Sequence, residues 1–189
     1  MQRAHEKMYR SRAAFKLKQL DAKFKLFQRR SVVIDLGCHP GGWSQIVMAQ
    51  ATQPEALLVG VDKLLMEPLE RQHFVQADIF LESTRRSVEQ ILKERKAHVV
   101  LADLAPTMTG SRIDDHLRSM ELNKEALRWA LRFLRPNGCF VTKVFQGGGL
   151  EAFRQELQRH FARVRNAKPP ASRPESVELY LVCQGFLGT

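Results

Sequence analysis

Residues 35–45 read Asp35-Leu36-Gly37-Cys38-His39-Pro40-Gly41-Gly42-Trp43-Ser44-Gln45, and they are the most informative part of the sequence. The apolar run Val32-Val33-Ile34 precedes it and Ile46-Val47-Met48-Ala49 follows it, so a buried strand ends in a glycine-rich turn from which a helix begins. The three glycines let the backbone approach a ligand with no Cβ in the way, and Pro40 stiffens the loop between them. The stretch therefore predicts a ligand-binding turn at the edge of an α/β sheet.

The next strand-like run, residues 57–61, ends in Asp62. In nucleotide-binding α/β folds an acid at this place accepts hydrogen bonds from ribose hydroxyls. The glycine spacing is not the G-x-G-x-x-G that admits a dinucleotide pyrophosphate, because Gly37 is followed by Cys38, and no phosphate-binding lysine motif follows. We therefore expect a nucleoside without a phosphate chain, and S-adenosylmethionine is the common cofactor of that kind. The alternative is a tight strand-to-helix turn without a ligand.

Length and composition indicate one globular domain over residues 1–189, because 44% of the residues are hydrophobic and 26% are charged. No apolar run approaches the roughly 20 residues of a membrane span, and the first residues lack the apolar core of a signal peptide. We therefore expect an intracellular protein of the cytoplasm or the mitochondrial matrix, with no membrane partner. The three cysteines form no C-x-x-C pair, so we expect core residues of a reduced compartment and no metal site.

The chain is strongly basic, with 30 Lys and Arg against 20 Asp and Glu, a net charge of +10 and a pI near 10.0. Such a charge favours a polyanionic partner, and nucleic acid is the first candidate. The alternative is a basic surface that only aids solubility.

A basic amphipathic helix is expected at about 11–27, with Ser11 as its cap. Eight cations lie within residues 10–30, and Tyr9 and Phe15 are interleaved with them, which suits the phosphate backbone of RNA. The alternative is a solvated helix face. The apolar residues of the helix are Ala13, Leu17, Leu20, Phe24 and Phe27, and the cations expected to contact RNA are Arg10, Arg12 and Lys18.

Apolar runs and helical patterns alternate along the chain, which is typical of a sheet with helices on both faces. The connection between the last two expected strands, Pro169 to Arg173, is short and polar and has no helical pattern, so these strands should be antiparallel. We predict a Rossmann-like α/β domain with a seven-stranded, mostly parallel sheet and an antiparallel last strand. The expected strands are 32–36, 57–61, 72–76, 98–102, 138–144, 163–168 and 178–184, and the other expected helices are 42–52, 85–96, 114–134 and 150–160.

Three polar groups stand where strands end or where the core should be apolar. Asp103 follows an apolar run at the carboxyl end of the fourth expected strand, where ligands of open α/β sheets gather. Lys143 interrupts the run Phe140 to Phe145, and a lysine in a buried strand is costly unless it is paired or functional. Glu178 begins the last expected strand.

With these residues the chain resembles the FtsJ/RrmJ family of S-adenosylmethionine-dependent ribose 2′-O-methyltransferases, from about Tyr9 to Gly185. It departs from the usual family pattern at Cys38-His39, where two alanines are common, and at Thr107, where asparagine is common. The motifs that carry the resemblance are Ser11-Arg12-Ala13-Ala14-Phe15-Lys16-Leu17, the turn at residues 35–45, Asp103-Leu104-Ala105-Pro106, Lys143-Val144-Phe145-Gln146-Gly147 and Glu178-Leu179-Tyr180.

The resemblance implies an RNA methyltransferase whose first expected substrate is large-subunit ribosomal RNA in the assembling ribosome. We expect the protein to be a monomer. Asp78 is expected near the adenine of the cofactor. The implied catalytic set is Lys16, Asp103, Lys143 and Glu178, and the implied cofactor-binding residues are Asp35, Gly37, Pro40, Gly41, Gly42, Trp43, Asp62, Asp78 and Asp103.

Methyl transfer from a sulfonium needs an attacking oxygen held in line behind the methyl carbon. Lys143 is the best candidate to act on a ribose hydroxyl, either as a neutral amine that accepts its proton or as an ammonium that steers its oxygen. Both roles stay open at the level of sequence, because the four groups would titrate as a coupled set.

Other functions also stay open. The chain could be a ribosome-assembly factor that binds RNA without needing methyl transfer, although the intact set of four residues argues against lost chemistry. It could also be a transfer-RNA ribose methyltransferase. A nicotinamide-dependent oxidoreductase is disfavoured by the glycine spacing.

Overall fold

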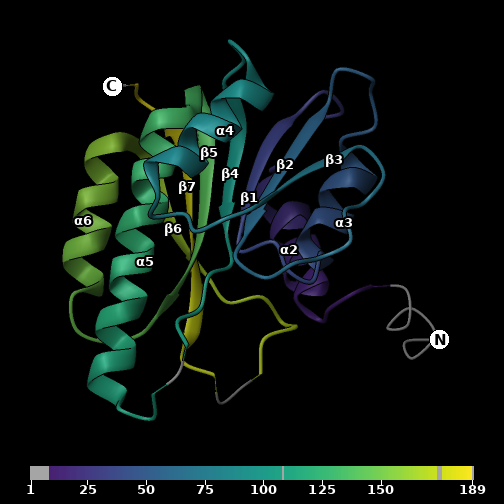
Figure 1. Cartoon of the computed structure of the whole chain (residues 1–189). Helices are drawn as coiled ribbons and strands as arrows, with labels where there is room; N and C mark the ends of the chain where they lie inside the picture. The colour runs from purple at the N-terminus through teal and green to yellow at the C-terminus, as the bar shows by residue number, and fades with distance from the viewer. Residues whose placement is uncertain (1–8, 108, 174–175, 189) are drawn as a thin grey trace.

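A computed structural model describes residues 9–107, 109–173 and 176–188 (Figure 1). Within these residues seven strands form one sheet in the order β3-β2-β1-β4-β5-β7-β6. The strands are β1 Val32–Leu36, β2 Leu57–Asp62, β3 Gln72–Gln76, β4 Ala97–Ala102, β5 Leu134–Phe145, β6 Phe161–Ala167 and β7 Glu178–Phe186.

The pairs from β3 through β5 are parallel, whereas β7 is antiparallel to both β5 and β6. Strand β7 thus lies between the two strands that precede it in the chain, and its first residue lies at the edge where the parallel strands end. The predicted seven-stranded, mostly parallel sheet with an antiparallel last strand is confirmed.

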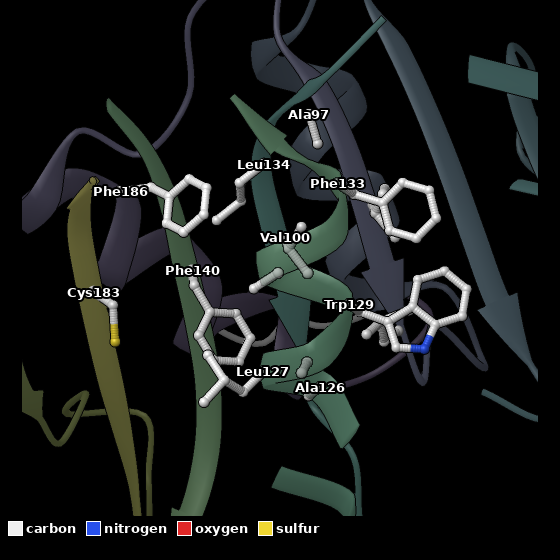
Figure 2. Packing of buried hydrophobic residues seen from close by; sticks show 14 of the residues in the cluster. Ala97, Val100, Ala126, Leu127, Trp129, Phe133, Leu134, Phe140, Cys183 and Phe186 are labelled. Carbon is white, nitrogen blue, oxygen red and sulfur yellow. The ribbon is translucent and has the colours of Figure 1, made fainter. Parts of the chain in front are cut away.

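Helices cover both faces of the sheet (Figure 1). Helices α2 and α3 pack on one face, where the buried side chains form a smaller core. Helices α4, α5 and α6 pack on the other face over the larger core, in which the rings of Trp129 and Phe133 are stacked with centroids 5.1 Å apart (Figure 2). The helices are α2 Ala13–Phe24, α3 Gly42–Gln50, α4 Glu82–Leu92, α5 Arg112–Phe133 and α6 Leu150–His160.

The N-terminal helix is shorter than the expected range 11–27, and Ser11 does not cap it. The helix ends because Lys25 adopts a left-handed backbone conformation, with φ 54°. The Asp21 carboxylate then accepts hydrogen bonds from the amides of Leu26 and Phe27, at 2.9 and 3.2 Å, which replaces helical bonding there. Leu26 and Phe27 therefore stay packed near the core without belonging to the helix.

Two further elements, α4 and β5, differ from the expected ranges by three residues or more. Helix α4 begins at Glu82 instead of residue 85 and ends at Leu92 instead of residue 96, because Lys93 has a positive φ of 57°. Strand β5 begins at Leu134, before the turn-like residues 136–138, and its pairing with β4 shifts register there. A bulge therefore accommodates residues that look like a stop signal in the sequence.

No helix in the described ranges is long and apolar enough to cross a membrane. Cys38, Cys139 and Cys183 are buried and none of them forms a disulfide, as expected for small core residues.

Candidate active site

Two ion pairs bring the four predicted catalytic residues together at the edge where the parallel strands end. Lys143 Nζ lies 3.3 Å from Asp103 Oδ1 and 3.4 Å from the Asp103 carbonyl oxygen. Lys16 Nζ lies 3.0 Å from Glu178 Oε2. Residues that are up to 162 positions apart in the chain thus meet in one cluster.

The sheet register explains this meeting. Ala102 of β4 pairs with Thr142 of β5, so Asp103 follows beside Lys143. The antiparallel pairing of β5 with β7 sets Lys143 opposite Tyr180 and Phe145 opposite Glu178. The sheet thus carries three of the four groups, and α2 supplies Lys16 from one face.

Tyr180 connects the two ion pairs, and sequence reasoning missed its role. Its hydroxyl donates a hydrogen bond to Asp103 Oδ1 at 3.1 Å, and Lys16 Nζ lies 5.9 Å from the centre of its ring. Burial and the charge of Asp103 raise the pKa of Tyr180 far above its usual range, so the phenol remains a donor. A signal was present, because residues 178 and 180 must share one face of the strand.

The surroundings hold Glu178 in its charged form. Burial alone would raise the pKa of its carboxyl, but the hydrogen bond from Lys16 and the charges of Lys143 and Lys16 outweigh burial and lower that pKa. The Lys143 side chain is only 8% exposed, so its contacts with Asp103 are shielded from water. The cluster therefore consists of two ion pairs on either side of Tyr180, and Lys143 is the more buried of its two lysines.

Beside Asp103 a cavity of about 430 Å³ opens at the ends of β1, β2 and β4. The predicted residues Gly37, Asp62 and Asp103 line it. His39 and Thr107, at two of the positions where the sequence departs from the usual family pattern, line it as well. The Asp62 carboxylate accepts hydrogen bonds from the amides of His39 and Leu64, both at 2.9 Å, which fixes its orientation.

Asp78 is close to this cavity, and its neighbours Ala77 and Ile79 belong to the lining. Its carboxylate accepts a hydrogen bond from the amide of Phe80 at 3.0 Å and lies 2.9 Å from Lys63 Nζ. Burial would raise the pKa of Asp78, but the Phe80 amide and Lys63 outweigh it, so the pKa is lowered.

The glycine-rich turn is shaped by close packing. Gly37 has φ +74°, and a Cβ there would lie 2.8 Å from Leu104 Cδ2, so a side chain would collide with the wall of the cavity. Gly41 begins α3 with φ +110°. A Cβ on Gly42 would collide with the Ser11 side chain. The lack of a side chain at Gly42 therefore lets the segment that leads into α2 pack directly against the turn.

Two of the predicted cofactor residues serve the packing of α2. Trp43 is buried, donates a hydrogen bond from Nε1 to the Ala13 carbonyl at 2.9 Å, and packs against Tyr180. The Pro40 carbonyl faces the guanidinium of Arg10 at 3.4 Å. Neither residue lines the 430 Å³ cavity.

Asp35 lies beneath the turn and is fully buried. Its Oδ2 accepts a hydrogen bond from Ser44 Oγ at 2.7 Å, and Ser44 in turn accepts one from Gln72 at 3.1 Å. Its Oδ1 has no hydrogen-bond partner in the described part of the chain. Burial raises the pKa of Asp35 to about 7, the hydrogen bond from Ser44 opposes this rise, and the charges of Asp103 and Asp62 add to it.

The predicted RNA-binding cations occupy different places. Arg12 lines a second cavity, of about 440 Å³, together with Lys16, Glu178 and Arg173. Lys18 is exposed on α2 outside that lining. Arg10 is exposed, but its guanidinium donates to the Glu67 carbonyl at 2.6 Å and thereby ties the start of this segment to the cofactor side of the molecule.

Comparison with protein families identifies the chain. The model of the FtsJ-like methyltransferases matches residues 9–186. The chain belongs to the FtsJ-like methyltransferase family. The resemblance carried by the sequence motifs is thereby confirmed.

Relatives of this FtsJ-like methyltransferase carry the name ribosomal RNA large subunit methyltransferase E. One from Acidiphilium cryptum is 44% identical over 97% of this chain and 80% of its own length. Another, from Wolbachia pipientis, is 42% identical over 100% of this chain and 95% of its own length.

Solved structures agree with the family. A crystal structure from Plasmodium falciparum, described as a ribosomal RNA methyltransferase, has a TM-score of 0.87 at 31% identity, covering 96% of this chain and all of that one. A Streptococcus mutans methyltransferase solved with SAH has a TM-score of 0.56 at 12% identity, covering 86% of this chain and 90% of that one. The first supports the FtsJ-like fold over nearly the whole chain, and the second shows a shared fold alone.

Proposed function

We propose that this chain transfers a methyl group from S-adenosylmethionine to a ribose 2′-hydroxyl of large-subunit ribosomal RNA. The observation that carries the proposal is the cluster of Lys143–Asp103 and Lys16–Glu178 beside a nucleoside-sized cavity. Membership of the FtsJ-like methyltransferases supplies the reaction class. The names of the relatives support ribosomal RNA as the substrate.

The residues around the 430 Å³ cavity fit S-adenosylmethionine, which supplies an electrophilic methyl group on a sulfonium. Gly37, at a positive φ that glycine adopts without strain, keeps the wall free of a Cβ. Asp62 has two oxygens that each accept one backbone amide, so each retains a lone pair for a ribose hydroxyl. The unpartnered oxygen of buried Asp35 leaves acceptor capacity beneath the same turn. Asp35, Gly37, Asp62, Asp78 and Asp103 would surround the cofactor.

Lys143 is the group that acts on the acceptor hydroxyl in this proposal. As an ammonium, Lys143 donates a hydrogen bond to the Asp103 carbonyl oxygen and forms an ion pair with the Asp103 carboxylate. A further N–H of that ammonium is then available to orient the 2′-oxygen, while the C–O bond forms, the S–C bond breaks and the hydroxyl proton leaves to solvent. We therefore favour the electrostatic role over that of a neutral base.

The remaining groups hold Lys143 and the RNA in position. Tyr180 donates a hydrogen bond to Asp103 Oδ1 and Lys143 forms an ion pair with the same oxygen, which restricts the carboxylate to one orientation. Lys16 and Glu178 form a charged wall of the 440 Å³ cavity, into which Arg12 and Arg173 bring further positive charge. Phosphates of the bound RNA would be attracted to these arginines.

The test is methyl transfer from labelled S-adenosylmethionine to naked large-subunit ribosomal RNA and to precursor subunits, followed by mapping of alkali-resistant linkages. Lys143→Ala should lower kcat at least about a hundredfold with little change in cofactor or RNA affinity, because its contact matters mainly in the transition state. Lys124→Ala is the matched control, since Lys124 is an exposed lysine on α5 away from the cluster. Full activity of Lys143→Ala would refute the assigned role.

The same variant distinguishes an enzyme from an assembly factor. Cells that carry only Lys143→Ala, at normal protein abundance, should mature large subunits poorly if methyl transfer is what the cell needs. Normal maturation by an inactive variant would instead favour the binding role.

A further inference from the structure

A basic cavity lies at the opposite end of the sheet from the candidate active site. It has a volume of about 200 Å³ and is formed where β1, β4, β5 and β6 begin and where β7 ends. Its lining includes Lys25, Arg135, Arg163 and His98 but no Asp or Glu, as far as the described residues extend. We call it the basal cavity.

The cations of the basal cavity lack acidic partners. No ion pair is formed by Lys25, Arg135 or Arg163 within the described ranges, and all three side chains are exposed. Two flanking cations are held against the ring of Phe24 instead, Arg165 at 5.5 Å and Lys23 at 5.3 Å from its centre. The acid nearest in sequence, Asp21, is occupied by the amides of residues 26 and 27. Three cations thus line one cavity without an acidic partner, which favours the binding of an anion there.

His98 adds a hydrogen-bond donor at this spot. Its Nδ1 accepts the amide hydrogen of Val32 at 3.1 Å, so the hydrogen of the neutral ring is on Nε2. Burial and the charges of Arg135 and Arg95 lower the pKa of His98, which keeps the ring neutral. The lining therefore combines fixed cations with a neutral donor, a combination that suits an oxyanion.

The backbone places Lys25 here against its own preference. Lys25 closes α2 in the left-handed region, with φ 54° and ψ 58°, where glycine is relaxed and a side chain is strained. A glycine would end the helix as well but would bring no charge to the cavity. The backbone strain at Lys25 thus comes with a positive charge at the basal cavity, and the packing of the helix end does not require that charge.

We infer that the basal cavity binds a backbone phosphate of the RNA substrate, as a second contact remote from the methylated nucleotide. The inference rests on the proposed function, because it takes RNA as the ligand. From Cys139, which lines the cavity, β5 runs four residues to Lys143, about 13 Å at the usual rise of a strand. Only an RNA whose backbone spans this distance can touch both sites, so a folded RNA that covers both ends of the sheet is bound more tightly than an oligonucleotide that fills only the active edge.

The first test uses Lys25→Gly, with Arg71→Gly as its matched control. Arg71 is also an exposed cation with positive φ, 65°, but it precedes edge strand β3, away from the basal cavity. Both substitutions should raise Tm by about 2 °C, because both relieve a left-handed side chain. Only Lys25→Gly should weaken binding of large-subunit ribosomal RNA, roughly fourfold at 0.15 M salt, the value for one phosphate contact.

The opposite directions of Tm and affinity are the decisive readout, because a merely structural role of Lys25 would move them together. Equal losses of affinity in Lys25→Gly and Arg71→Gly would show an effect of net charge alone and would overturn the inference. Unchanged affinity in Lys25→Gly would overturn it as well.

The second test uses Arg135→Gln/Arg163→Gln, with Lys124→Gln/Arg86→Gln as the control of equal charge on exposed positions of α5 and α4. The slope of log affinity against log salt should fall by about 1.5 for ribosomal RNA. For a short single-stranded oligonucleotide that fills only the active edge, affinity and slope should not change. A loss for both RNAs, or for neither, would overturn the inference.

These outcomes are separable from failure of the proposed function. RNA binding that depends on the basal cavity without any methyl transfer would refute the enzymatic proposal and leave the RNA contact standing. Methyl transfer by all variants with unchanged RNA affinity would support the enzymatic proposal and refute the RNA contact at the basal cavity. An acidic protein captured by the wild type but not by Arg135→Gln/Arg163→Gln, with RNA binding intact, would overturn the assignment to RNA.

Discussion

The buried carboxyl of Asp35 should make the stability of this protein depend on pH in an unusual direction. Its pKa is about 7 in the folded protein against 3.8 as the ordinary value. A carboxyl with a raised pKa binds its proton more tightly when folded, so the stability it contributes is full below pH 3.8 and is lost as pH rises through 7. The difference, 7 − 3.8 at 1.36 kcal/mol for each pKa unit, amounts to about 4 kcal/mol.

Asp35→Asn isolates this contribution because the amide keeps the shape of the carboxyl and cannot ionise. Its oxygen can still accept the Ser44 hydroxyl, while its nitrogen takes the place of Oδ1, which has no partner. A buried donor without an acceptor costs about 1–3 kcal/mol at every pH. The variant should therefore be less stable than wild type at pH 4 and more stable at pH 8.

The assay is urea unfolding of both proteins between pH 4 and pH 8, with the difference in unfolding free energy plotted against pH. The difference cancels other titrating groups, among them His98, whose lowered pKa changes stability in the opposite sense. It should change by about 4 kcal/mol across the range, in favour of the variant at high pH. A difference that stays flat would refute the reasoning, since Asp35 would then be ionised at no cost.

Three other measurements test the two cavities at the active edge. Asp62→Ala should weaken S-adenosylmethionine binding about tenfold or more in calorimetry, the scale of a lost charge-assisted hydrogen bond, and unchanged affinity would put the cofactor elsewhere. Arg12→Gln/Lys18→Gln should lower the salt slope of RNA binding by about 1.5, and an unaltered slope would move the RNA to another face. Tyr180→Phe keeps the ring but not the hydroxyl bonded to Asp103, so kcat should fall about fivefold at constant KM for RNA, whereas wild-type turnover would mean that Tyr180 only packs.

Most of the fold could be predicted from local patterns, because most strands are apolar runs and each long helix repeats at helical spacing. The ends of the helices were harder to predict from the sequence. Lys25 and Lys93 end their helices with positive φ although lysine gives no such signal, and Leu81 precedes α4 without a capping side chain. The bulge in β5 could not be predicted because residues 136–138 read as a turn, and only the pairing of Leu134 and Cys139 with β4, on either side of them, keeps them within a strand.

For the candidate site, the detectable residues were those that break an apolar pattern. Lys143 and Asp103 could be found in this way, and the structure brings them into contact. The sequence could not distinguish the role of Trp43 from that of the glycine-rich turn that it follows. In the structure its indole packs under α2 instead of lining the cavity. The hydrogen bond from Tyr180 to Asp103 depends on strand register, and the basal cavity depends on the meeting of five strand ends. The periodicity of a sequence predicts neither of these.

The place of β7 in the sheet has a consequence for biosynthesis. During translation β5 and β6 emerge from the ribosome before the strand that must separate them, so β5 can pair only with β4, and β6 has no partner strand, until β7 has been made. The same segment carries Glu178 and Tyr180, so a nascent chain that lacks it has one edge of β5 unpaired and no complete cluster around Lys143. One segment made late in synthesis thus supplies both the last hydrogen bonds of the sheet and the last side chains of the cluster around Lys143.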